Sequence, residues 1–167
     1  MRKSLALLIL SCFLISAVPT VIDAPQILNY AQGCLSHRGP LERAADGFVY
    51  VKVSDDYIFK TLKLLGNDAI EAPPYFGAGK VGAHISVIDA VESQNKSIDL
   101  PQLGKTIEFK ITNFASVDVE NGHGKRRIYF FRVEAPELAR IRKTNGLSPK
   151  IRGFDFHITV AIEYLNL

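Results

Sequence analysis

Apolar and polar residues alternate along several short stretches of the chain, the pattern of β-strands that are buried on one face. β-branched and aromatic residues concentrate in these stretches, which are residues 48–53, 83–88, 106–112, 128–133 and 154–163. Residues 57–65 and 135–145 have the apolar spacing of amphipathic helices. The order strand, helix, strand therefore occurs at both ends, with the strand 106–112 between the two units. It predicts an α+β fold in which helices cover one side of a mainly antiparallel sheet.

The first residues follow a different pattern, because a basic start, Met1 to Lys3, precedes an apolar run from Leu5 to Val18. This combination is typical of a secretory signal peptide. The run is too short to span a bilayer, which needs about 20 apolar residues. We therefore expect a periplasmic or secreted protein that has no contact with the membrane once the signal is removed. Ala17 and Ala24 are both candidate last residues of the signal.

The chain is expected to divide into three parts, the first being the signal peptide at residues 1–24. Residues 25–47 carry scattered Gly, Pro and polar residues and predict an irregular lead-in with one short helix near residues 41–45. Residues 48–167 predict a single domain, since 167 residues, 47% of them hydrophobic, can bury one core. The net charge of +3 permits an anionic substrate but does not indicate a stable complex with nucleic acid. Removal of the signal would leave Cys34 without a disulfide partner.

Two of the expected strands carry the same motif, His-Ile-Ser/Thr-Val, which begins at His84 and again at His157. Because side chains alternate along a strand, the histidine and the hydroxyl residue of each motif (Ser86, Thr159) project from one face. A neutral imidazole can take a proton from an attacking water, and a protonated imidazole can give one to a leaving oxygen. The hydroxyls can donate hydrogen bonds to phosphate oxygens. Such a set can hydrolyse a phosphodiester without a metal or another cofactor.

The repeated order within two apolar strands distinguishes these histidines from His37 and His123, which lie in turns. Either motif alone also fits a half-buried sheet histidine bonded to its neighbours, whereas the pair favours a functional site. A metal site fits less well, because each motif offers one ligand and no group of residues has zinc-ligand spacing.

Four further residues are candidates for substrate binding because of their position in loops. Tyr75 and Phe76 precede the first motif and are expected to stack on a base, and Lys80 is expected to meet a phosphate. Arg152, shortly before the second motif, is another candidate phosphate contact. The alternative is that the two aromatic residues close the core and that Lys80 is a solvated loop charge.

In the paired motifs, their separation and the strand-helix-strand order at both ends, residues 48–163 resemble the 2H phosphoesterases, which include bacterial cyclic phosphodiesterases of RNA ends. The resemblance implies a bilobal, pseudo-twofold fold with mainly antiparallel sheets, helices on the outer side, a central cleft and no cofactor. It assigns catalysis to His84 and His157, with Ser86 and Thr159 holding the phosphate. The implied substrates are 2′,3′-cyclic phosphates at RNA or nucleotide ends and other small phosphodiesters.

We therefore expect a monomeric, metal-independent phosphodiesterase that acts on a small cyclic nucleotide, an RNA end or a short nucleotide phosphodiester. The alternative from a different class is a non-catalytic exported module that binds a nucleotide or another anionic ligand in the same cleft. A structural domain with two coincidental motifs is a third reading. In that case the two histidines would lie far apart or on opposite faces, so their relative position discriminates between the readings.

Overall fold

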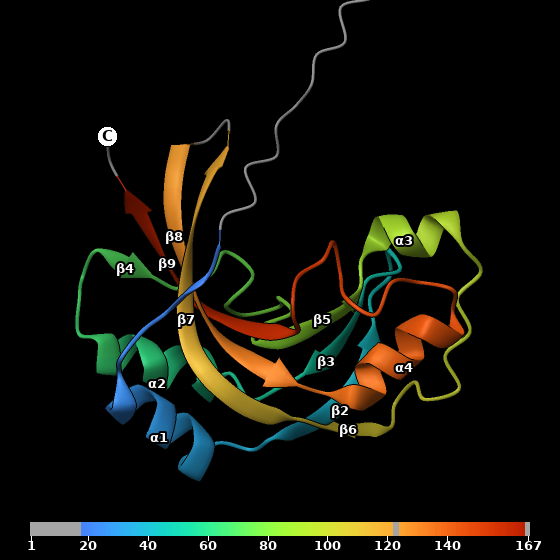
Figure 1. The fold of residues 1–167 in the computed structure, drawn as a ribbon, viewed down its shortest axis with the longest axis horizontal. Coiled ribbons are helices and arrows are strands. Elements are labelled where there is room, and N and C mark those ends of the chain that lie inside the picture. The colour runs from blue at the N-terminus through green and yellow to red at the C-terminus, as the bar shows by residue number, and fades with distance from the viewer. Residues whose placement is uncertain (1–17, 122–123, 166–167) are drawn as a thin grey trace, which may run out of the picture.

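The alternating stretches form the strands of one antiparallel sheet in the computed structural model, which describes residues 18–121 and 124–165 (Figure 1). The strands are β1 (Thr20–Val21), β2 (Arg38–Arg43), β3 (Val49–Lys52), β4 (Ile70–Glu71), β5 (His84–Ile88), β6 (Thr106–Glu108), β7 (Lys110–Asn121), β8 (Gly124–Glu134) and β9 (His157–Leu165). The helices are α1 (Pro25–Cys34), α2 (Asp56–Leu65), α3 (Ala90–Asn95) and α4 (Pro136–Thr144).

The sheet order is β1-β7-β8-β9-β5-β3-β2-β6, and the short strand β4 pairs with β9. This order places β5 and β9, the two strands that begin with the motif histidines, side by side in the middle of the sheet. Only Phe109 separates β6 from β7, so one segment pairs with β2 and then continues, as the long curved strand of Figure 1, alongside β8.

One face of the sheet packs against α1 and α2 and forms the core. Helix α2 lies against β9, and α1 lies against β7. Tyr57 of α2 is fully buried, with its ring centroid 5.9 Å from that of Phe131, and Phe131 lies 5.1 Å from Phe114. Burial of each such side chain contributes about 1.5–3 kcal/mol to stability. The expected helices at 57–65 and 135–145 are confirmed as α2 and α4.

The segment 25–47 differs from its expected irregular structure. Helix α1 begins with Pro25 in its first turn, where proline is tolerated, and buries Ile27 and Ala31 against the core. The helix expected near residues 41–45 is wrong, because strand β2 occupies residues 38–43 and pairs with β3 and β6. The glycine and proline that suggested a loop lie in this strand, in which Leu41 is fully buried.

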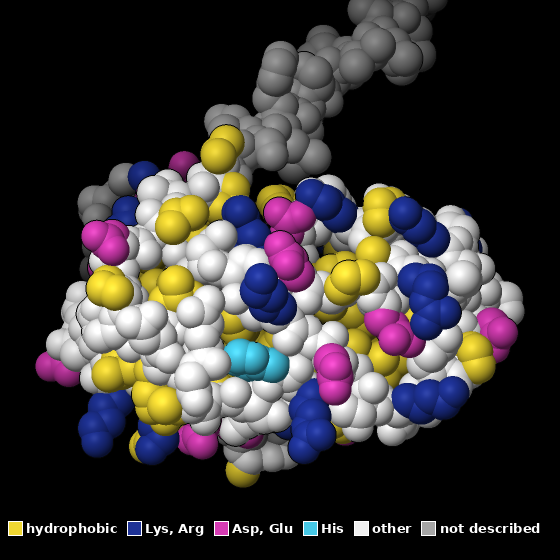
Figure 2. All heavy atoms as spheres, turned by 60° about the horizontal axis from the view of Figure 1, so that its bottom comes forward, with side chains coloured by type: hydrophobic (Ala, Val, Ile, Leu, Met, Phe, Trp, Pro, Cys, Tyr) yellow, Lys and Arg dark blue, Asp and Glu magenta, His cyan; other side chains and the backbone are white. Residues whose placement is uncertain are grey.

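The expected antiparallel sheet is confirmed, but as one continuous sheet. Its division into two lobes related by a pseudo-twofold axis stays a prediction. Residues 1–17 of the expected signal peptide lie outside the described residues, and in the part of the chain that is described no helix is long and apolar enough to cross a membrane. Acidic and basic side chains are interspersed over the face seen in Figure 2, which agrees with the small net charge.

Candidate active site

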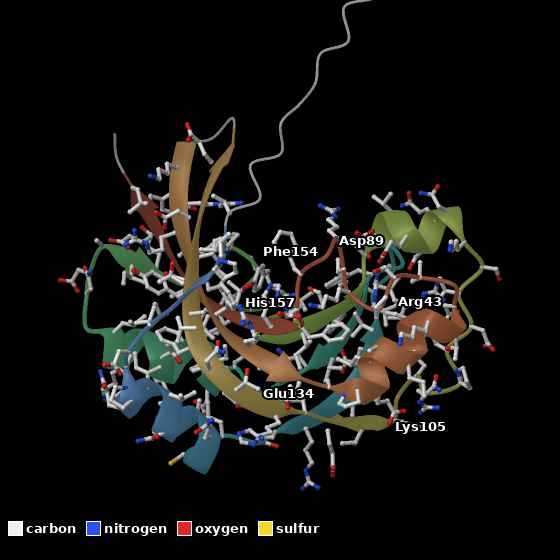
Figure 3. The ribbon with its side chains drawn as sticks, in the orientation of Figure 1. Arg43, Asp89, Lys105, Glu134, Phe154 and His157 are labelled. Carbon is white, nitrogen blue, oxygen red and sulfur yellow. The ribbon has the colours of Figure 1, made fainter. Side chains whose placement is uncertain are left out.

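The two histidine motifs meet across the pair β5 and β9, where Ile85 lies opposite Ile158. Both isoleucines are fully buried in the core. Continuing this register by one residue in each direction sets each histidine opposite the hydroxyl residue of the other motif. Directly opposite residues of an antiparallel pair project from the same face, with Cβ atoms about 4.5–5.5 Å apart. The four side chains on this face are His84 opposite Thr159 and His157 opposite Ser86 (His157 is labelled in Figure 3).

The neighbouring strands extend these two pairs into rows of four. The first row is Lys52, His84, Thr159 and Phe130, and the second row is Tyr50, Ser86, His157 and Arg132. We call the surface formed by these eight residues the reactive face. Each histidine therefore has a hydroxyl residue on one side and a basic residue on the other.

Both imidazole rings are held by the same hydrogen bond. Nδ1 of His84 lies 2.7 Å from the carbonyl oxygen of Gly82, and Nδ1 of His157 lies 2.8 Å from that of Asp155, in each case two residues earlier in the chain. Because a carbonyl oxygen can only accept, Nδ1 carries the hydrogen in both rings. Nε2 is therefore the atom of each histidine that gains and loses a proton.

The surroundings of both rings disfavour the charged imidazolium. Burial lowers the pKa of His84 from its usual value, and the charges of Lys52 and His157 lower it further, against the hydrogen bond to Gly82. Burial also lowers the pKa of His157, while the Asp155 carbonyl and carboxylate act in the opposite direction. Both histidines can therefore be neutral near pH 6.5, which leaves Nε2 able to accept a proton.

Aromatic rings account for much of this burial. The centroid of Tyr75 lies 4.7 Å from that of His84 in an edge-to-face contact, and Phe48 lies at 5.5 Å in the same arrangement. On the other side, Phe130 lies 5.2 Å from His157. The rings fix the orientation of the two imidazoles.

The family model described as "Swiss Army Knife, 2H phosphoesterase domain" matches residues 49–166, a range that contains both motifs. The chain belongs to the 2H phosphoesterase family. Among curated proteins and among solved structures, no match to the chain was found. Family membership supports a phosphoesterase activity in general, and the prediction of a 2H phosphoesterase from its two motifs is confirmed.

The turn before the first motif of this 2H phosphoesterase is fixed by a lysine and an aspartate. Lys52 Nζ donates to Asp55 Oδ1 at 2.8 Å and to the Val81 carbonyl oxygen at 2.6 Å. Asp55 Oδ1 also accepts from the backbone N–H of Ala83 at 2.8 Å. Ser54, Asp55 and Asp56 have the residue types of a helix N-cap, but the Asp55 side chain makes no capping hydrogen bond and instead holds the start of β5.

Gly82 lies within this turn and has a left-handed backbone, with φ of 71°. A Cβ atom there would lie 2.3 Å from Asp55 Oδ1 and 2.4 Å from Lys52 Nζ. Glycine is therefore required where the carbonyl that orients His84 is placed. Sequence reasoning missed all three residues, although the glycine two positions before the motif was a usable signal.

The loop before the second motif is held by Arg142, whose side chain is completely buried. Its guanidinium donates to both carboxylate oxygens of Glu92 at 2.7 and 2.8 Å. It also donates to the carbonyl oxygens of Val87, Ser148 and Lys150. Arg142 thus ties α3, α4 and the loop to the end of β5. By its position in the chain alone, Arg142 is a basic residue in the last turn of α4.

The four predicted substrate-binding residues have different environments in this 2H phosphoesterase. Tyr75 reaches the reactive face, where burial raises its pKa to about 12 and interaction with Thr159 opposes part of the rise. Phe76 packs against the core, and Lys80 Nζ donates to the Pro74 carbonyl oxygen at 2.7 Å. Arg152 lies in a turn and forms an ion pair with Asp89 at 3.3 Å. Tyr75 therefore lies beside the motifs, whereas Phe76, Lys80 and Arg152 make their contacts elsewhere.

The remaining histidines and Cys34 lie apart from this site or outside the described residues. His37 Nε2 lies 2.9 Å from the Ala31 carbonyl oxygen, and Cys34 is exposed. His123 falls outside the residues that the structure describes. Over residues 18–121 and 124–165, no cluster of three or more His, Cys, Asp or Glu side chains could hold a metal ion.

Proposed function

We propose that this 2H phosphoesterase is a metal-independent phosphodiesterase that acts on cyclic phosphates or short nucleotide phosphodiesters. The observation that carries the proposal is that two histidines, each with Nδ1 bonded to a carbonyl oxygen and Nε2 left to titrate, share one face with two hydroxyl residues. This set matches the needs of phosphodiester hydrolysis, namely one base, one acid and donors to the non-bridging oxygens.

For a 2′,3′-cyclic phosphate the reaction begins with the attack of water on phosphorus. Nε2 of one histidine takes a proton from the water as its oxygen bonds to phosphorus. Nε2–H of the other histidine gives a proton to the ribose oxygen as its bond to phosphorus breaks. One water is added and a phosphomonoester is released. Such proton transfers typically contribute about 10²–10⁴-fold each to the rate.

Ser86 and Thr159 have the second role in the proposal. Each hydroxyl lies opposite a histidine and can donate to a non-bridging oxygen, where negative charge builds up in the transition state. Loss of one such donor typically costs about 10²–10³-fold in kcat. Tyr75, which contacts His84 edge-on, forms a wall of the site against which a base can stack, as Phe76 can beside it.

Lys80 and Arg152 remain proposed phosphate contacts. The Arg152 side chain is 71% exposed, and its ion pair with Asp89 can be exchanged for a substrate phosphate at small cost. Lys80 is likewise exposed, and its bond to the Pro74 carbonyl oxygen can be replaced in the same way.

The location, periplasmic or secreted, is proposed on the apolar start of the chain, which favours export. We also propose that the protein is a monomer. Thr20 and Val21 pair with Ser116 and Ala115 of β7. Removal of the signal after Ala17 would keep this pairing, whereas removal after Ala24 would delete β1. We therefore favour Ala17 as the last residue of the signal, and N-terminal sequencing of the exported protein tests this choice.

The proposed activity is tested with 2′,3′-cyclic nucleotides, 3′,5′-cyclic nucleotides and nucleoside 3′-monophosphates, each incubated with the protein in the presence of EDTA. We expect hydrolysis of the cyclic diesters and none of the monoesters, with products identified by ³¹P NMR. A His84→Gln/His157→Gln double variant is the control for contaminating activity. Binding of these nucleotides without turnover would contradict the proposal and support a binding module instead.

A further inference from the structure

The reactive face carries two basic residues, and their contacts are unequal. Lys52 lies opposite His84 on β3, and Arg132 lies opposite His157 on β8. The Lys52 ammonium is already satisfied, because it bonds to Asp55 at 2.8 Å and to a backbone carbonyl oxygen at 2.6 Å. It therefore acts within the turn before β5 and has little capacity left for a ligand.

Arg132 differs, since its guanidinium makes no hydrogen bond to any of the described residues. Its nearest acidic contact is Asp155, with Nε and Oδ2 3.7 Å apart. The other oxygen of that carboxylate lies 2.5 Å from Lys150 Nζ. The Arg132 side chain is only 30% exposed, so a partly buried cation lies beside His157, held by a long ion pair to a carboxylate that it shares with Lys150. The planar edge of a guanidinium matches two oxygens of a phosphate group.

The next strand adds a second unsatisfied polar group in the same row. Asn113 of β7 lies directly opposite Arg132, so the two side chains share a face. The Asn113 side-chain oxygen is buried and has no hydrogen-bond partner within the described part of the chain. A buried acceptor without a partner carries a desolvation cost that a donor on a ligand would remove. A ligand with a phosphate next to a hydroxyl group can pair with Arg132 and, once the Asn113 amide turns toward this face, donate to the Asn113 oxygen.

We propose that Arg132 and Asn113 form a second anion-binding subsite beside His157, which takes a further phosphate of the substrate and a neighbouring sugar hydroxyl. The inference rests on the proposed function, since it takes the reacting phosphodiester to lie between β5 and β9. Adjacent strands are about 4.8 Å apart, so Arg132 lies one strand beyond the reacting group and meets a neighbouring phosphate. The preferred substrate is thus a cyclic nucleotide or short oligonucleotide that carries a phosphate in addition to the scissile one.

Binding of two product-like nucleotides tests this subsite independently of turnover. Isothermal titration calorimetry compares adenosine 3′-phosphate with adenosine 3′,5′-bisphosphate on the wild type, on Arg132→Gln and on Arg140→Gln. Arg140 is an exposed arginine of α4 and controls for the loss of one positive charge. We expect the wild type and Arg140→Gln to bind the bisphosphate about tenfold more tightly, since charge-assisted hydrogen bonds contribute about this much. We expect Arg132→Gln to bind both nucleotides equally.

Asn113→Leu gives a second measurement, and unfolding by urea confirms that each variant is folded. We expect this variant to bind the bisphosphate more weakly than the wild type. Equal binding of the two nucleotides by the wild type, or no binding of either, would overturn the subsite, as would an equal loss for both in Arg132→Gln. Because turnover is measured separately, hydrolysis of the cyclic nucleotide without tighter binding of the bisphosphate would refute the subsite and leave the proposed activity standing. Tighter binding of the bisphosphate without hydrolysis would refute the proposed activity and leave the binding subsite standing.

Discussion

Replacement of Gly82 by alanine tests how the site is positioned, because this residue contacts no substrate in the proposed mechanism. Its carbonyl oxygen accepts from Nδ1 of His84, and its φ of 71° lies in the left-handed region. The added Cβ would lie 2.3 Å from Asp55 Oδ1 and 2.4 Å from Lys52 Nζ, closer than side-chain atoms can approach. The Lys52–Asp55 pair must therefore open, or the turn must move together with His84.

The expected cost follows from these contacts. An alanine in the left-handed region costs about 1–2 kcal/mol. Loss of the hydrogen bond from Ala83 N–H to the Asp55 carboxylate adds about 1.5–3 kcal/mol, and the partly exposed ion pair with Lys52 adds at most about 1 kcal/mol. Because part of this cost can be relieved by side-chain movement, we expect the free energy of unfolding to fall by about 2–4 kcal/mol. Displacement of His84 is expected to lower kcat/KM about 10²-fold.

Gly79→Ala is the matched control, since Gly79 has a similar φ of 74° but no atom within 4 Å of an added Cβ. It shares the backbone cost of about 1–2 kcal/mol and is expected to keep its activity. The assay combines urea unfolding with kcat/KM on a 2′,3′-cyclic nucleotide. If folded Gly82→Ala has the same kcat/KM as Gly79→Ala, the turn does not position His84 and the reasoning is wrong.

Four further predictions concern stability, pH and the hydroxyls. Arg142→Met removes the donor to a carboxylate and three carbonyl oxygens. We expect this variant to lower the free energy of unfolding, measured in urea, by about 3–5 kcal/mol. The control Arg140→Met, at an exposed site, should change the free energy of unfolding by less than about 0.5 kcal/mol. Since burial lowers the pKa of both histidines, kcat/KM should peak below pH 6.5. An optimum above pH 7 would contradict the lowered pKa values. Because the pKa of each histidine is lower in the native state, the unfolded chain takes up protons first as the pH falls through about 6.5. The free energy of unfolding of the wild type should therefore fall between pH 7.5 and 5. It should fall by less in a variant with both histidines replaced by glutamine. Thr159→Ser should keep most of the activity, and Thr159→Ala should lose about 10²-fold in kcat. Equal kcat values for these two variants would show that the hydroxyl has no role.

The sequence was sufficient for the strands that carry the motifs because their alternation is strong. It also indicated that the two histidines act together, and the register of Ile85 with Ile158 places both motifs on one face. The strand pairing itself could not be derived from the sequence, because residues 73 positions apart are brought together only by the sheet order. Local patterns contain no information about such a distant partner.

The positioning residues were missed for a related reason. Asp55 follows the pattern of a helix cap, but its carboxylate bonds to Ala83, a residue brought close by the pairing of β3 with β5. Arg142 follows the pattern of a helix C-terminus, yet it is completely buried among carbonyl oxygens of distant segments. In β2 the Gly and Pro residues suggested a loop, whereas pairing on both sides makes the segment a strand.

The central claim is that His84 and His157 together hydrolyse a phosphodiester, and the kinetics of single variants test it most directly. The measurement is kcat/KM on a 2′,3′-cyclic nucleotide in EDTA for the wild type, His84→Gln, His157→Gln and His37→Gln, each shown to be folded. We expect losses of at least about 10³-fold for either motif histidine and activity close to wild type for His37→Gln. Activity within about tenfold of wild type after loss of either motif histidine would contradict the account.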